Sequence, residues 1–180
     1  MLELVIEPME FWDEATETFI EIKGQTLRLE HSLVSISKWE SKWHKPFLSD
    51  KEKTKDETID YIKCMTLTQN VNPDIYNRIN QEHIHKIKQY IEDPMTATTI
   101  NRPKNGRPNR EQVTAELIYY WMIALNIPVE FQKWHLNKLL MLVEVCNIKN
   151  QPPKKMSKNA IKNRNAALNA ARRQQLNSKG

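Results

Sequence analysis

The chain contains little glycine and little cysteine, and both shortages exclude kinds of functional site. Only 3 of the 180 residues are glycine, so there is no glycine-rich loop to cradle a nucleotide phosphate and no glycine-rich elbow around a nucleophilic serine. The 2 cysteines, Cys64 and Cys146, lack the close spacing of a metal knuckle or a redox pair, so we interpret them as reduced core residues. These absences favour a protein without enzyme activity and without a cofactor.

Histidines and acids do not form a recognisable metal or catalytic site either. His83 and His85 are two residues apart, which on a helix turns their side chains about 200° from each other, so they cannot bind one metal ion together. The acids in polar stretches are scattered in a way that is typical of solvated surface: Glu14, Glu17, Asp56, Glu57 and Asp60. We therefore expect no metal site and no catalytic residues.

Long hydrophobic runs are also missing. The longest apolar stretch, residues 117–125, covers only about half of the roughly 20 residues that a membrane helix needs, so it predicts a buried helix. The first residues lack the basic start and the long apolar run of a secretory signal. We expect no membrane association and a location in the cytoplasm of the cell that makes the protein.

Acids are absent from the last part of the chain, which is strongly basic. Residues 151–180 follow a Pro152-Pro153 break and carry these cations: Lys154, Lys155, Lys158, Lys162, Arg164, Arg172, Arg173 and Lys179. The whole chain has 27 Lys and Arg and 22 Asp and Glu, so residues 1–150 hold 19 cations against 22 anions, or −3. We predict one globular domain over residues 1–150 and a basic arm, helical or flexible, over residues 151–180. Such an arm suits phosphate or an acidic protein surface, and its charge does not choose between them.

The beginning of the chain has the pattern of strands. Apolar and polar residues alternate with a period of two in residues 2–7 and 18–31, which predicts half-buried strands. Gly24-Gln25 indicates a hairpin turn, because glycine supplies the positive φ of tight hairpins. A lone hairpin is marginal in water, so we expect residues 2–7 to pair with it or a helix to cover it. Residues 1–31 are therefore predicted to be β-rich.

From residue 32 the apolar period becomes helical. Residues 32–150 are predicted to form helices, with a capping box at Thr54-Lys55-Asp56-Glu57 opening one of them. Residues 111–125 and 130–148 form the two most apolar helices, and their short connection predicts an antiparallel helical hairpin at the centre of the core. Trp121→Ala is then expected to cost about 3 to 5 kcal/mol. The fold class predicted is α+β and predominantly α-helical.

A protein partner explains the remaining features better than a nucleic acid does. Trp39, Trp43 and Phe47 would form an adhesive edge if they are not wholly buried. The predicted partner-binding set is completed by the arm cations Lys154, Lys155, Lys158, Lys162, Arg164, Arg172 and Arg173. Nucleic-acid binding is disfavoured because the tryptophans lie on apolar helix stripes and no aromatic residue is interleaved with the basic segments.

Three stretches resemble a known family. They are SISKWESKWHKPFL (35–48), TAELIYYWMIALNIP (114–128) and PKKMSKN (153–159). In this order they resemble the tail assembly chaperones encoded among the tail genes of tailed bacteriophages, over about residues 33–176. The resemblance implies a protein of the host cytoplasm that binds the tape-measure protein, keeps its long helices soluble and helps to recruit the major tail protein. It supplies no active-site residues.

A structural virion component is the alternative hypothesis. A baseplate or head–tail connector piece would use the same helical hairpin and basic arm to insert into neighbouring subunits. Self-association stays open under both hypotheses.

Overall fold

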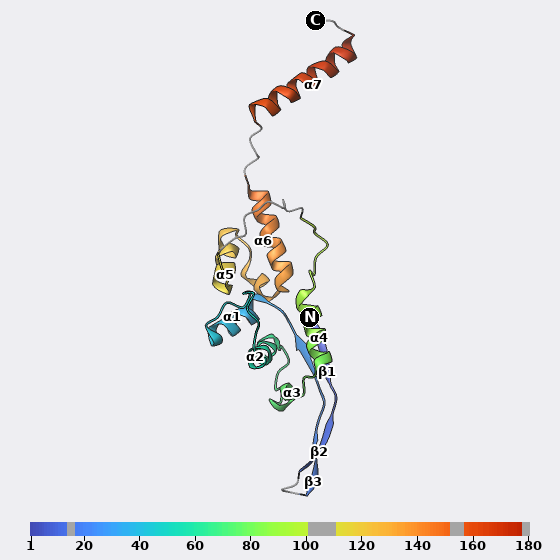
Figure 1. Ribbon diagram of the computed structural model, residues 1–180, viewed down its shortest axis with the longest axis vertical. Helices are drawn as coiled ribbons and strands as arrows, with labels where there is room; N and C mark the ends of the chain where they lie inside the picture. Colours follow the sequence, from blue (N-terminus) through green and yellow to red (C-terminus); the bar gives the residue numbers. More distant parts are fainter. Residues whose placement is uncertain (14–16, 101–110, 152–156, 178–180) are drawn as a thin grey trace. The chain divides into compact units, whose positions relative to one another are not determined.

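The computed structural model describes residues 1–13, 17–100, 111–151 and 157–177 (Figure 1). The chain forms two compact units, Met1–Asn147 and Ile148–Gly180. We call the first unit the body and treat the second by itself. The fold is α+β and mostly helical, which confirms the predicted fold class.

The strands form one interrupted two-stranded ribbon. They are β1 (Leu2–Ile6), β2 (Met9–Asp13), β3 (Thr18–Ile22) and β4 (Gln25–Leu29). β1 pairs antiparallel with β4, and β2 pairs antiparallel with β3. The expected pairing of residues 2–7 with this region is confirmed, whereas the predicted hairpin between β3 and β4 is wrong.

Gly24 lies at the interruption of the ribbon and does not form a hairpin turn. A Cβ at Gly24 would lie 2.6 Å from the carbonyl oxygen of Ile6 and 2.8 Å from the nitrogen of Pro8. Glycine is needed here because the opposite strand passes too close for a side chain. Glycine at position 24 predicts a turn from the sequence, but in the structure it allows the two strands to approach closely.

The second edge of β4 is covered by the segment after α2. The N–H of Leu67 donates to the carbonyl of Arg28 at 2.8 Å, and the N–H of Glu30 donates to the carbonyl of Met65 at 2.9 Å. Leu27 and Leu29, on the buried face of β4, are fully buried. β4 is therefore held on both edges, and it carries the sheet into the core.

The helices follow in chain order, and polar caps define their starts. They are α1 (Leu33–Trp43), α2 (Lys55–Met65), α3 (Asp74–Asn77), α4 (Gln81–Glu92), α5 (Ala115–Ala124), the 3₁₀ helix η1 (Val129–Lys133), α6 (Leu136–Asn150) and α7 (Lys158–Leu176). The predicted capping box of α2 is present: the Glu57 N–H donates to Thr54 Oγ1 at 3.2 Å, and the Thr54 N–H donates to Glu57 Oε2 at 2.8 Å. Such reciprocal bonds satisfy backbone groups that a helix start leaves unpaired.

The core is centred on α1 and not on the predicted helical hairpin. α1 packs against α2, α5 and η1, and α5 has its most extensive backbone contact with α1. The second predicted helix begins only at Leu136, because residues after Pro128 form η1 and Trp134 has extended backbone. Ile118 is fully buried, whereas Trp121 is half-buried. The partial burial of Trp121 lowers the cost that we expect for Trp121→Ala.

Among the residues that the structure describes, no helix is both long enough and apolar enough to cross a membrane.

Candidate partner-binding surfaces

The predicted aromatic edge is largely buried. Trp39 and Phe47 are 2% and 7% exposed, and only Trp43 is half-buried. The Trp39 ring packs edge-on against Phe47 at 5.2 Å between centroids, and its Nε1–H donates to the carbonyl of Glu57 at 2.9 Å. Trp39 and Phe47 therefore do not meet the condition for an adhesive edge, because α2 and the loop after α1 cover both rings.

Phe47 nevertheless forms part of the wall of a groove between α2 and α4. The groove has a volume of about 580 Å³. Its apolar lining comes from the loop after α1, from α2 and from α4: Phe47, Tyr61, Ile62, Ile84, Ile87 and Ile91. We call it the α2–α4 groove. An apolar channel between two helices can accept the apolar face of a third helix.

Charged residues form the rim of the α2–α4 groove. Three are cations, and one acid accompanies them: Lys51, Lys53, Lys88 and Glu52. Lys53 Nζ lies 4.3 Å from the centroid of the Phe47 ring, a cation–π distance. Burial lowers the pKa of Lys53, and the nearby Glu57 carboxylate opposes that change. The rim is therefore suited to a partner with acids beside its apolar residues.

Trp39 lines a smaller pocket on the other side of the same loop. This pocket has a volume of about 260 Å³ and shares Lys51, Glu52 and Lys53 with the α2–α4 groove. Trp39 and Phe47 thus support two hollows that flank one charged loop. The sequence indicated the aromatic residues, but it did not indicate that α4 supplies the opposite wall.

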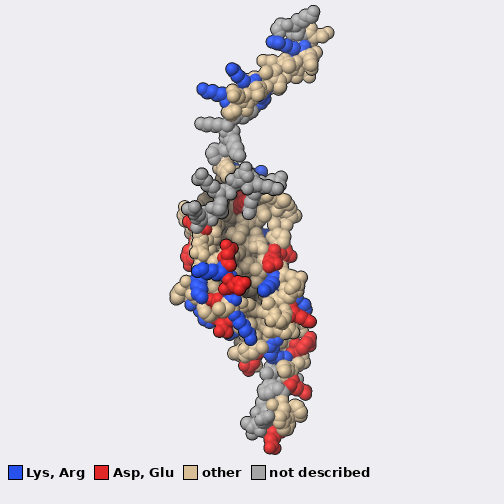
Figure 2. Space-filling model, viewed as in Figure 1, with Lys and Arg blue, Asp and Glu red and all other residues tan. Residues whose placement is uncertain are grey.

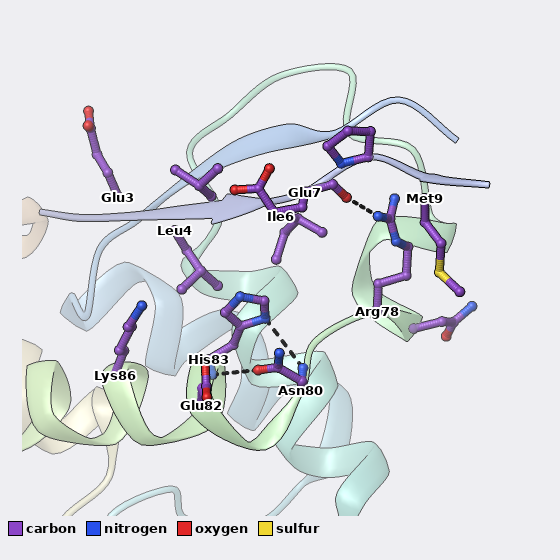
Figure 3. Close-up of a pocket in the computed structure, with 13 residues that line it drawn as sticks. Glu3, Leu4, Ile6, Glu7, Met9, Arg78, Asn80, Glu82, His83 and Lys86 are labelled. Atoms are coloured by element: carbon purple, nitrogen blue, oxygen red, sulfur yellow. Dashed lines mark hydrogen bonds between the residues drawn. The ribbon is translucent and has the colours of Figure 1, made fainter. Parts of the chain in front are cut away.

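A second hollow lies along β1 and the start of α4 (Figure 3). Its volume is about 860 Å³. The Arg78 guanidinium reaches the carbonyl of Glu7, and Asn80 and His83 form a reciprocal cap in which the His83 N–H donates to Asn80 Oδ1 at 2.9 Å (Figure 3). These polar groups form hydrogen bonds with one another. We therefore interpret the hollow as the edge of a strand and not as a reaction site.

The geometry of β4 shows which backbone groups β1 presents at this edge. Arg28 uses its N–H for Thr68 Oγ1 at 2.8 Å and its carbonyl for Leu67. Both groups therefore point away from β1, and Glu3, which is opposite Arg28, must direct its own N–H and carbonyl to the outer edge of β1. The exposed acids Glu3 and Glu7 lie along this edge.

A buried polar network crosses the core near the α2–α4 groove. His31 Nδ1 and the Tyr61 hydroxyl form a hydrogen bond of 2.5 Å, and the His31 and His135 rings are 5.1 Å apart between centroids. Burial, aided by His135, lowers the pKa of His31 to about 3, and burial raises the pKa of Tyr61. The imidazole and the phenol are therefore neutral at neutral pH. This network joins elements of the core through neutral groups.

In residues 1–13, 17–100, 111–151 and 157–177, no group of three or more His, Cys, Asp or Glu could hold a metal ion.

The predicted arm cations lie on a helix without buried residues where the structure describes them. α7 has no buried residue, and it carries Lys158, Lys162, Arg164, Arg172 and Arg173. Figure 2 shows their blue side chains without red between them on the visible face of this helix. Lys154 and Lys155 lie outside the described residues. The predicted set is thus split between a core-lining group, Trp39 and Phe47, and an exposed basic helix.

Sequence reasoning missed one exposed aromatic pair. Trp12 on β2 and Phe19 on β3 are cross-strand partners and are 50% and 70% exposed. Their spacing around a turn is the signal for this pair in the sequence, but the glycine pattern predicts the hairpin at Gly24-Gln25 instead.

Comparisons with known proteins give no relative: no protein-family model, no curated protein and no solved structure matches the chain. The surfaces are therefore assigned from the geometry of this chain alone.

Proposed function

We propose that this protein is a tail assembly chaperone of a tailed bacteriophage, which acts in the host cytoplasm. It binds the tape-measure protein, assists the assembly of the tail tube and has the major tail protein as a further partner. The observation that carries the proposal is the α2–α4 groove, with its volume of about 580 Å³, its apolar lining and its three lysines at the rim. The resemblance of residues 35–48, 114–128 and 153–159 to that family supplies the identity of the partner.

The groove matches the chemistry of such a partner. A tape-measure segment is a long amphipathic helix, which aggregates when its apolar stripe is exposed to water. Ile84, Ile87 and Ile91 follow one another at steps of three and four along α4, so they form a continuous apolar wall against which a second apolar stripe can pack. Lys51 and Lys88 then face the acids beside that stripe. Binding of this kind needs no catalytic group, and we propose no enzyme activity.

A substitution in the wall of the groove tests the proposal. Ile84 is half-buried, so Ile84→Asp places a carboxylate in the groove while it disturbs the core less than a change at Ile87. The affinity for a helical tape-measure fragment, measured by calorimetry, is expected to fall at least tenfold, or about 1.4 kcal/mol.

Gln89→Asp is the matched control, because Gln89 is exposed on α4 and does not line the groove. This variant is expected to bind as tightly as the original chain. Thermal melting of both variants checks that the fold is retained. If Ile84→Asp binds the fragment as well as Gln89→Asp does, the groove is not the binding site.

The alternative is a structural virion component, such as a baseplate or head–tail connector piece. The exposed Trp12–Phe19 pair on the β2–β3 ribbon favours it, because a subunit of a permanent assembly buries such aromatic residues against its neighbours. Mass spectrometry of purified virions distinguishes the two functions: a chaperone is absent from the finished particle, and a structural component is present in stoichiometric amount.

A further inference from the structure

The N-terminal region carries acids and no lysine or arginine. Residues 1–22 contain seven acids: Glu3, Glu7, Glu10, Asp13, Glu14, Glu17 and Glu21. Four of these side chains are described, and Glu3, Glu7, Glu10 and Glu17 are all exposed. The β2–β3 part of the ribbon extends beyond the helices of the body (Figure 1), and its visible end shows red without blue in Figure 2. This end of the ribbon is therefore an acidic surface.

The same ribbon exposes aromatic side chains. The Trp12 and Phe19 rings meet edge to face, with 5.0 Å between centroids and 67° between planes. They are 50% and 70% exposed, and the nearby Met9 is 53% exposed. A two-stranded ribbon is marginal in water by itself, and exposed aromatic pairs are favoured binding surfaces. A partner that covers these rings would stabilise the ribbon.

α7 has the complementary surface. At 100° per residue, Lys158, Lys162, Arg172 and Arg173 fall within an arc of about 100° around the helix. Ile161 and Leu168, which are 45% and 48% exposed, lie immediately beside this arc. One face of α7 therefore combines cations with large apolar side chains, and residues 148–180 contain no acid.

We propose that the protein associates with itself head to tail, with the basic face of α7 of one copy docked on the β2–β3 ribbon of a second copy. The rise from Lys158 to Arg173 is roughly 22 Å, and a five-residue strand such as β2 is about 17 Å long, so the basic face can follow the whole ribbon. Arginine guanidinium groups stack on aromatic rings, which places Arg172 or Arg173 against Trp12 and Phe19. Ile161 and Leu168 extend the apolar contact.

A second copy fits both surfaces better than other occupants do. Two ribbons repel each other through their acids, and two α7 helices repel each other through their cations. A nucleic acid would pair with α7 but would leave Trp12 and Phe19 uncovered. The head-to-tail contact is heterologous, so it builds a ring or an open chain of subunits.

This inference goes beyond the proposed chaperone function and does not require the α2–α4 groove. Its variants lie outside that groove. If self-association fails, the proposal for the α2–α4 groove is unaffected. If the groove does not bind a helical fragment, the proposal of self-association is unaffected.

Charge reversal of the full-length chain, followed by sedimentation velocity over a range of concentrations, tests the contact. The first variant is Glu10→Lys with Glu17→Lys, and the second is Arg172→Glu with Arg173→Glu. Each variant alone sets two reversed charges against a facing surface of the same sign, so we expect its dissociation constant to rise at least tenfold. An equimolar mixture is expected to associate again, because the reversed charges of one variant then face the reversed charges of the other. The association of the original chain is expected to weaken with salt.

The matched control for the second variant is Lys38→Glu with Lys133→Glu, which makes the same change in net charge at exposed positions of the body. It is expected to associate like the original chain, and circular dichroism checks that every variant is folded. A wild-type chain that is monomeric at all concentrations would overturn the proposal, including the case in which α7 binds the ribbon of its own chain. Mixed variants that stay monomeric, or association that tolerates both reversals, would also overturn it.

Discussion

The carboxylate of Glu40 accepts a hydrogen bond from the backbone N–H of Ala115 at 2.8 Å, across 75 residues of sequence. Its other oxygen accepts from the N–H of Phe47 at 2.7 Å, and Glu40 is only 7% exposed. Ala115 is the first residue of α5, so the carboxylate also lies at the positive end of the helix dipole. One side chain thus joins α1, the loop after it and the start of α5.

Glu40→Ala is expected to lower the free energy of unfolding by about 2 to 4 kcal/mol, because it leaves two buried N–H groups without a partner. Urea denaturation measures this change. Glu92→Ala is the control, since Glu92 is exposed at the end of α4, and its effect is expected to stay within about 0.5 kcal/mol. Equal effects of the two substitutions would mean that the Glu40 bonds contribute little.

The centre of the core can be located by a pair of substitutions in α5. Ile118 is fully buried and Trp121 is half-buried. Ile118→Ala is expected to cost about 2 to 5 kcal/mol, and Trp121→Ala is expected to cost less despite the larger ring. Melting temperatures or urea midpoints show which substitution destabilises the protein more. A larger loss of stability for Trp121→Ala than for Ile118→Ala would mean that Trp121 lies at the centre of the core.

Stability is expected to fall in mild acid because of His31. Its pKa is lowered from 6.5 to about 3 by burial. Between these two pH values His31 is therefore protonated in the unfolded chain and neutral in the folded chain. The stabilising contribution is complete above about pH 6.5 and is lost progressively as the pH falls towards 3, by at most about 1.4 kcal/mol per pH unit. The pKa of His135 is also lowered by burial, which adds to the same trend.

The measurement is the free energy of unfolding between pH 7 and about 4 for the original chain and for His31→Gln. The variant is expected to lose a large part of the slope, whereas His85→Gln, at an exposed position of α4, is expected to keep it. Parallel curves for His31→Gln and the original chain would show that His31 is protonated in the folded state.

Truncation after Gln151 is expected to leave the melting temperature of the body unchanged, because α7 buries no residue.

The intact chain is expected to bind duplex DNA weakly and without sequence preference at about 0.15 M salt, since binding through phosphate contacts alone falls steeply with salt. A gel shift measures this. Sub-micromolar, sequence-specific binding at that salt would contradict the chaperone proposal.

The features that could be predicted from the sequence are those set by neighbouring residues. The Thr54–Glu57 capping box, the alternation in β1 and β4 and the basic composition of α7 were all readable, because each depends on a few adjacent positions. Only one wall of the candidate site could be predicted from the sequence. Phe47 was identified, but the opposite wall of the α2–α4 groove is Ile84, Ile87 and Ile91, whose period indicates an apolar face without indicating what that face contacts.

The sequence by itself determined the fold class, the helical period and the position of the basic arm. Only the tertiary structure decided that β1 pairs with β4, that Gly24 serves a close backbone approach and that Trp39 is buried while Trp12 is exposed. The physical reason is the range of the interactions. Periodicity and capping act within a few residues, whereas strand pairing and burial depend on contacts between distant segments, such as the bond between Glu40 and Ala115, which local patterns do not encode.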